Sequence, residues 1–298
     1  MSPVEATLAP TLQVLLGGLV DGCVYALIAV GMSLVYSITR VINLAQGGFV
    51  VLAALLAVSL QSAGLNPLVT LVVVVVVFAA GLAVVDRVVI LPASRRATPD
   101  RMLLVTVGLL QAVGGVLLLV WGNLPYTARP FTSGAPFTVL GVAIQRQQLW
   151  ILGALAIAVV ALNLLLNRTE LGLTMRATAS RPDAAQMVGV DVDRVRLIAF
   201  SLSGAMAAMA GAAVIPITFL QFDTTTSYAV SGFVAAVVGG LGSIGGAVLG
   251  GLLLGVAEGV FARYTGASLA EVAAIGLLIV LLLVRPAGLL GRTAEVRR

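Results

Sequence analysis

Long apolar runs separated by short polar intervals dominate the hydrophobic pattern of this chain. Several runs approach the roughly 20 residues that an α-helix needs to cross a bilayer. The pattern predicts an all-α, polytopic transmembrane helical bundle with about eight or nine membrane segments. The predicted segments are Leu12–Ser37, Ala45–Leu60, Pro67–Val85, Met102–Trp121, Leu149–Leu166, Leu197–Ile217, Ala229–Gly242, Ile244–Phe261 and Ser268–Val284.

The seventh and eighth segments are short and glycine-rich, and only Ser243 separates them. They form either two crossings or one re-entrant hairpin over residues 229–261. Their centre, GGLGSIGG (239–246), concentrates residues that weaken helices and so favours a break. Because transporters often point a broken helix at the substrate, we expect a translocation path here. Its candidate residues are Gly239, Gly240, Gly242, Ser243 and Gly245. The later glycines recur at four-residue spacing, which favours close helix packing instead.

Composition supports a membrane protein, because 60% of the residues are hydrophobic, against about 45–50% in soluble domains. The 17 basic residues are all arginine, and in a polytopic protein such residues usually mark cytoplasmic loops rather than a nucleic-acid site. The single cysteine, Cys23, lies in an apolar run, which argues against a disulfide framework and a Cys/His metal site. Without histidine or paired acidic residues in the spans, an intramembrane enzyme has little support.

Arginine placement predicts the topology. The intervals 38–44, 86–101 and 167–196 and the tail from Arg285 hold one, four, five and four arginines, or 14 of the 17. Only Arg129, Arg146 and Arg263 remain for the other side. The positive-inside rule therefore places the N-terminus outside and the C-terminus in the cytoplasm. This requires an odd number of crossings and makes 122–148 an external loop with enough alternation for a short hairpin. That loop is either a docking surface for an external partner or an ordinary connection.

The stretch from residue 17 to 48 contains a second candidate path lining. Asp21 lies in an apolar span, where an ionisable group is costly unless it faces protein or water. Two amides and a glycine pair follow at the mouth of the next span, and irregular backbone at membrane depth is tolerated only around a cavity or inside protein. The candidates are Asp21, Tyr25, Asn43, Gln46, Gly47 and Gly48. Alternatively, Asp21 lies at the outer interface and the glycines serve only packing.

A polar stretch from Leu173 to Gly211 contains four arginines and three aspartates. It includes a short predicted helix: Pro182 suits a first helical position, Asp183 favours the N-terminal dipole, and Gly189 can end the helix. Ala184, Met187 and Val188 can form an apolar face. We interpret this unit as a place where another protein pushes on the membrane domain. The alternative is a solvated cytoplasmic loop that only fixes orientation.

Four stretches, in order, resemble the permease family of ATP-binding-cassette (ABC) importers for branched-chain amino acids, particularly the "H" type subunit. They are YALIAVGMSLVYSITRVINLAQGG, MRATASRPDAAQMVGVDVDRVRLIAFSLSGAMAAMAG, GGLGSIGGAVLGGLLLG and VRPAGLLG. They are the most specific parts of a resemblance that covers most of the chain. The resemblance implies one transmembrane permease domain over residues 1–298 in a bacterial inner membrane, with a cytoplasmic coupling loop at 168–196, working by alternating access.

The resemblance also implies partners. These are a second related permease subunit (or a second copy), two cytoplasmic ATPase subunits, and an external solute-binding protein. This chain would bind no cofactor, since ATP would be used by the ATPase subunits, and it contains no P-loop. The residues expected to contact an ATPase are Arg176, Ala177, Arg181, Pro182, Asp183, Ala184, Met187 and Gly189.

The sequence departs from the family pattern in three places. Gln46, Gly47 and Gly48 replace a common His-Gly-acid sequence, Arg181 replaces asparagine, and Gly245 replaces proline. The first change leaves urea, short amides or other amino acids open as substrates. A self-contained ion-coupled carrier is the alternative from another class, but such carriers place several ionisable groups at midspan, and only Asp21 is a candidate here.

Overall fold

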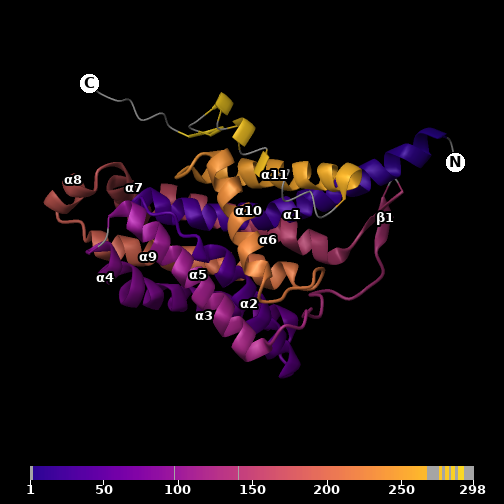
Figure 1. Cartoon of the computed structure of the whole chain (residues 1–298), viewed down its shortest axis with the longest axis horizontal. Coiled ribbons are helices and arrows are strands. Elements are labelled where there is room, and N and C mark those ends of the chain that lie inside the picture. Colours follow the sequence, from indigo (N-terminus) through magenta and orange to yellow (C-terminus); the bar gives the residue numbers. More distant parts are fainter. Residues whose placement is uncertain are drawn as a thin grey trace.

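The computed structural model describes residues 3–96, 98–139, 141–266, 275–276, 279–281, 283–285 and 288–291. Within them the chain forms a helical bundle with one short antiparallel hairpin (Figure 1). The elements are α1 (Pro3–Thr39), α2 (Ala45–Ser62), α3 (Pro67–Val85), the π-helix η1 (Asp86–Ile90), α4 (Leu91–Ser94), α5 (Pro99–Trp121), β1 (Phe137–Val139), β2 (Val142–Ile144), α6 (Arg146–Arg168), α7 (Glu170–Ser180), α8 (Pro182–Met187), α9 (Val192–Val214), α10 (Thr224–Gly239) and α11 (Ile244–Thr265).

The predicted polytopic helical bundle is confirmed. Seven helices among the described residues are long and apolar enough to cross a membrane, and α10 is a shorter apolar helix. The spans are Pro10–Thr39, Ala45–Ser62, Pro67–Ser94, Arg101–Trp121, Arg146–Arg168, Val192–Val214 and Ile244–Thr265.

The bundle has two polar ends, which we name the arginine end and the hairpin end. At the arginine end, Arg40 contacts Ala179 and Arg95 contacts Asp193, so three of the arginine-rich intervals meet there. At the hairpin end, Gln13 bonds to Ala143 in β2. Figure 1 shows α4, α7 and α8 at one end and β1 at the other. The division of polar intervals between two sides therefore agrees with the arginine pattern.

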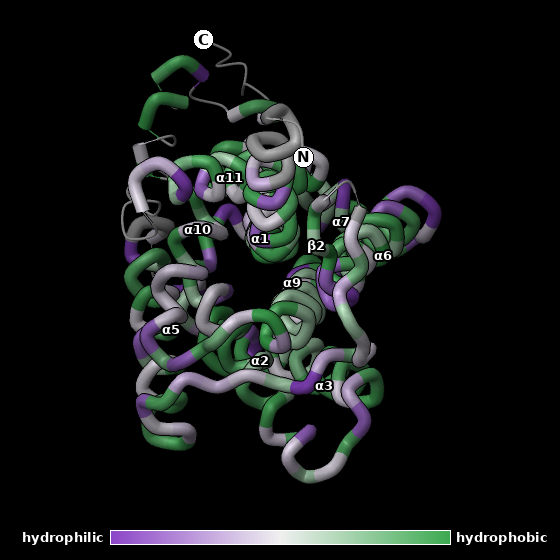
Figure 2. Tube along the Cα trace, turned by 90° about the vertical axis from the view of Figure 1, so that its right-hand side faces the viewer, coloured by the Kyte–Doolittle hydropathy of each residue, from purple (hydrophilic) through white to green (hydrophobic). Residues whose placement is uncertain are grey.

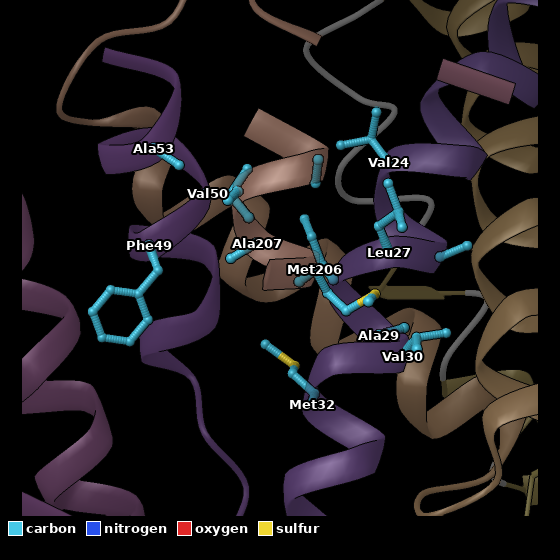
Figure 3. Close-up of a cluster of buried hydrophobic side chains, with 14 of the residues drawn as sticks. Val24, Leu27, Ala29, Val30, Met32, Phe49, Val50, Ala53, Met206 and Ala207 are labelled. Atoms are coloured by element: carbon cyan, nitrogen blue, oxygen red, sulfur yellow. The ribbon is translucent and has the colours of Figure 1, made fainter. Parts of the chain in front are cut away.

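The core lies where α1, α2 and α9 meet. Most residues of these helices are buried, whereas α3, α5 and α6 bury few. Figure 2, which looks from the hairpin end, shows α9 near the centre, with α3, α5 and α6 towards the periphery. Figure 3 shows Leu27 and Met32 of α1, Phe49 of α2 and Met206 of α9 in the same apolar cluster. The outer faces of the peripheral helices are left for lipid or for other subunits.

Glycines bring α1 and α11 into backbone contact. A side chain at Gly251 would overlap the backbone of Ala26, and one at Gly255 would overlap the backbones of Gly18 and Gly22. Small residues allow this close approach in lipid, where packing rather than the hydrophobic effect joins helices. The later glycines therefore serve helix packing.

α10 and α11 connect the two ends of the bundle. α10 follows a loop in which Leu220 pairs with Tyr126 at the hairpin end, and the turn after it lies beside Tyr36 and Ser37, near the arginine end. Figure 1 shows α10 running across α1 rather than alongside it. α11 returns to the hairpin end, where Arg263 donates to Thr11. This geometry favours two crossings over a re-entrant hairpin.

The last described residues lie at the end of the bundle opposite to the end of α11. The amides of Leu289 and Leu290 donate to the carbonyls of Val238 and Gly239, so residues 289–290 lie at the arginine end. Thr265, the last residue of α11, lies at the opposite end. The first and last described segments are therefore at opposite ends, as an odd number of crossings requires. Most of the predicted segment Ser268–Val284 lies outside the described residues.

Candidate functional site

The short helix predicted in the coupling loop is present as α8. Pro182 occupies its first turn, where the missing N–H costs nothing, and Asp183 lies beside the positive end of the helix dipole. Gly189 ends the unit with φ +87°, a conformation that favours glycine. The amide of Gly189 donates to Gln186 and that of Val190 donates to Ala185. The local start and stop signals are thus confirmed.

All eight residues predicted to contact an ATPase are exposed at the arginine end. Met187 is 83% exposed and the neighbouring Val188 is 80% exposed, an unusual position for apolar side chains at a polar end of the bundle. Ala185 is buried and fixes α8 to the rest of the chain. The unit therefore presents an apolar surface on a backbone that is held in place.

Arg40 connects this unit to the end of α1. Its Nη2 donates to the carbonyl of Ala179 in α7 at 2.9 Å, and its guanidinium lies 5.9 Å from the centre of the Tyr36 ring. Arg40 has φ +57°, a backbone conformation uncommon for residues other than glycine. The connection between α1 and α2 is thus attached directly to α7.

A buried ion pair holds α9 against η1. The Arg196 Nε lies 3.0 Å from Asp86 Oδ1, and the two side chains are 11% and 1% exposed. Arg196 also donates to Ser94, while Asp193 pairs with Arg95 on the surface. The sequence analysis missed this network. The available signal was an aspartate directly after a run of valines, where a buried charge needs a partner.

The predicted path residues of the α1–α2 connection lie inside the subunit. Gln46 is fully buried; its Nε2 donates to the Ser203 carbonyl at 2.9 Å and its Oε1 accepts from Ser203 Oγ at 2.8 Å. Gly31 leaves room for this amide, because a side chain there would overlap it. Asn43 is also buried, and its amide has no hydrogen-bond partner among the described residues. Gln46 thus holds α2 against α9, and a path-lining role stays a prediction.

Gly47 and Gly48 make two further close contacts for α2. A side chain at Gly47 would overlap the backbone of α10 at Ala229, and one at Gly48 would press on Leu110 and Val113 of α5. Both glycines are buried. They therefore set the distance from α2 to α10 and α5 within this subunit.

The remaining path candidates in α1 belong to a polar cluster with α10 and α11. Asp21 is exposed, and Tyr25 one turn later is partly buried. The Tyr25 ring meets that of Tyr228 edge-on at 6.4 Å, and Glu258 of α11 lies near the Tyr25 side chain. The sequence analysis did not include Tyr228 or Glu258 among the candidates. Polar side chains here would face water or another subunit more favourably than lipid.

The glycine-rich candidates form the turn between α10 and α11. Gly240 and Gly242 have φ +103° and +85°, and Ser243 accepts from the Gly246 amide as the cap of α11. Gly245 is exposed with open space around its Cα. The predicted helix break is present, but it lies near the arginine end and away from Asp21 and Tyr25.

Comparison with known proteins gives the family. The model for "Branched-chain amino acid transport system / permease component" matches residues 14–284. BraD of Pseudomonas aeruginosa, a high-affinity branched-chain amino acid transport system permease protein, is 31% identical over 94% of this chain and 96% of its own length. The corresponding protein LivH of Escherichia coli strain K12 is also 31% identical, with the same coverage.

Among solved structures, PsaBC from Streptococcus pneumoniae in complex with Fab superposes with a TM-score of 0.51 at 12% identity, covering 91% of each chain. This likeness concerns the fold alone. The family model and the relatives cover nearly the whole chain and agree with its helical, multi-pass architecture. The chain therefore belongs to the permease components of branched-chain amino acid transport systems.

Proposed function

We propose that this chain is the membrane-spanning subunit of an ABC importer that translocates branched-chain or similar neutral amino acids by alternating access. Separate ATPase subunits would use the ATP, an external solute-binding protein would deliver the substrate, and this chain would catalyse no reaction itself. The family and the relatives' transport systems support this class. The observation that carries the proposal is the exposed α8, which begins at Pro182 and ends at the 83% exposed Met187.

The coupling step follows from how α8 is attached. A partner bound to Met187 and Val188, at the end of α8, would also move α7. The two helices are consecutive, and a single residue, Arg181, joins α7 to α8. α7 is hydrogen-bonded to Arg40 at the end of α1. A displacement of α8 and α7 at the arginine end would therefore be transmitted to α1, which packs on α10 and α11. Alternating access requires such a transmission between two states that stabilise different contacts.

We also propose the orientation in the inner membrane. The arginine end would be cytoplasmic, with the C-terminus, and the hairpin end external, with the N-terminus. The hairpin end would then receive the binding protein, and α8 would reach the ATPase. The departure at Gln46-Gly47-Gly48 bears mainly on packing within the subunit, so it gives little reason to prefer urea or amides.

Co-purification tests the coupling role. The chain is expressed with its ATPase and affinity-purified, and we expect ATPase to be retained by the parent and lost in Met187→Glu and Ala184→Arg. Leu124→Glu, at a 65% exposed apolar position near the hairpin end, is the matched control and should retain ATPase. Equal retention by all three variants, each monodisperse in detergent, would contradict an ATPase contact at α8.

A further inference from the structure

The outer face of α5 carries a polar side chain at the middle of the membrane. Gln111 is exposed and lies ten residues from each end of the span Arg101–Trp121. No hydrogen bond to its amide is found within the described part of the chain. Hydrocarbon offers no partner for an amide, so this exposure at mid-depth is unfavourable against lipid.

The side chains around Gln111 are small. Gly108 and Gly115 lie three residues before and four after it on the same helix face, Ala112 lies beside that face, and all four residues are exposed. A methyl group at Gly108 or Gly115 would meet no atom within 4 Å. The subunit itself therefore does not need these glycines, which weaken a helix relative to alanine. At Gly251, in contrast, the backbone of Ala26 leaves no room for a side chain.

Only the middle of the α5 face is small and polar, because nearer its ends α5 exposes Leu104 (69%) and Leu119 (87%), much as the other peripheral helices expose large apolar side chains. α3 exposes Val72 and Val76, and α6 exposes Ile157 and Val160, all at half exposure or more. Glycines with open surroundings occur singly there, at Gly81 and Gly153. Large apolar side chains suit lipid, whereas small residues around a hydrogen-bonding side chain suit another transmembrane helix. The middle of the α5 face, around Gln111, thus has the composition of a helix–helix contact.

We propose that the second permease subunit packs on this α5 face, and that the Gln111 amide hydrogen-bonds across the contact at mid-membrane depth. This inference rests on the proposed function, because an importer of this class would contain two permease subunits. The depth requires a membrane-embedded partner. An amide both donates and accepts, so an equivalent helix related by a twofold axis could pair with it reciprocally. Gly108 and Gly115 would let the two backbones approach closely.

Site-specific photocross-linking tests the contact in the whole transporter. Gln111→Cys is labelled in native membranes with a thiol-directed benzophenone and irradiated. Val76→Cys and Ile157→Cys are matched controls on α3 and α6, and Cys23 is fully buried, so the parent chain gives the background. We expect a covalent adduct with a permease polypeptide, identified by peptide mass spectrometry, only from position 111. Adducts with lipid alone, or with a protein other than a permease, would overturn the proposal.

Association measurements provide a second test. Gln111→Leu should weaken permease pairing in liposomes by roughly three- to twentyfold, the range expected for one interhelical hydrogen bond in a membrane, measured by energy transfer on lipid dilution. Gly115→Leu should weaken pairing at least as much, and Gly81→Leu, in open space on α3, should not. Equal pairing of all variants would contradict the contact.

The same preparations separate this inference from the proposed function. ATPase retention reports on coupling at α8, and the position-111 adduct reports on permease pairing. An adduct without retained ATPase would support the α5 contact and contradict the importer. Retained ATPase together with adducts to lipid alone would support the importer and contradict the proposed α5 contact.

Discussion

Replacing Arg196 with leucine should be far more damaging than replacing its neighbour in the same network, Arg95. Arg196 is paired with Asp86, and their side chains are only 11% and 1% exposed. Removing the arginine leaves an uncompensated buried carboxylate, which costs about 3–5 kcal/mol. The Arg95–Asp193 pair is just as short, at 2.9 Å, but its side chains are 66% and 43% exposed. Such a pair is worth about 0–1 kcal/mol.

Thermal unfolding of the detergent-purified chain measures this difference. At about 2–4 °C per kcal/mol for a chain of this size, Arg196→Leu should lower Tm by roughly 6–20 °C and Arg95→Leu by less than about 4 °C. The double variant Asp86→Leu/Arg196→Leu should recover most of the loss, because neither charge is then left alone. Equal shifts for the two single variants, or a double variant less stable than Arg196→Leu, would refute the assignment of the loss to a buried charge.

Three further changes test the packing and the attachment of the coupling unit. Gly255→Ala should destabilise the chain by about 1–3 kcal/mol through overpacking against α1, while Gly245→Ala, in open space within α11, should not lower Tm, because alanine favours a helix more than glycine does. Gln46→Leu leaves the Ser203 hydroxyl without its acceptor and should cost about 1–3 kcal/mol in the same unfolding assay. Arg40→Gly relieves the φ +57° backbone but removes the bond to α7, so Tm should change little while substrate-stimulated ATPase activity of the assembled transporter falls.

Local signals in the sequence located most of the helices and the coupling unit. Apolar runs of membrane length need no tertiary information, and the proline and glycine bounding α8 act through their own backbone preferences. The start of α10 was misplaced: it begins at Thr224, five residues before the predicted Ala229, because its first turn is polar. Judged by its apolar pattern alone, the threonine-rich first turn of α10 resembles a loop. It is helical in the structure, where tertiary contacts bury Thr225.

Long-range pairs were beyond the sequence. Asp86 and Arg196 are 110 residues apart, and Gln46 and Ser203 are 157 apart, so neither pair has a local pattern. Gln46 was predicted as path lining because an amide beside two glycines suggests a water-filled mouth, whereas the structure gives it a buried partner. Gln111 was not predicted as a site, because a single amide in an apolar run does not reveal which way it faces. Only the fold shows that it faces outwards.

Uptake by the reconstituted transporter tests the central claim, that this chain is a permease driven through α8, most directly. Liposomes containing the chain with its second permease and ATPase subunits receive leucine and the solute-binding protein outside and ATP inside. We expect leucine accumulation that requires ATP and is abolished by Met187→Glu, with Leu124→Glu unaffected. Accumulation by this chain alone, driven by an ion gradient and unchanged by Met187→Glu, would contradict the account.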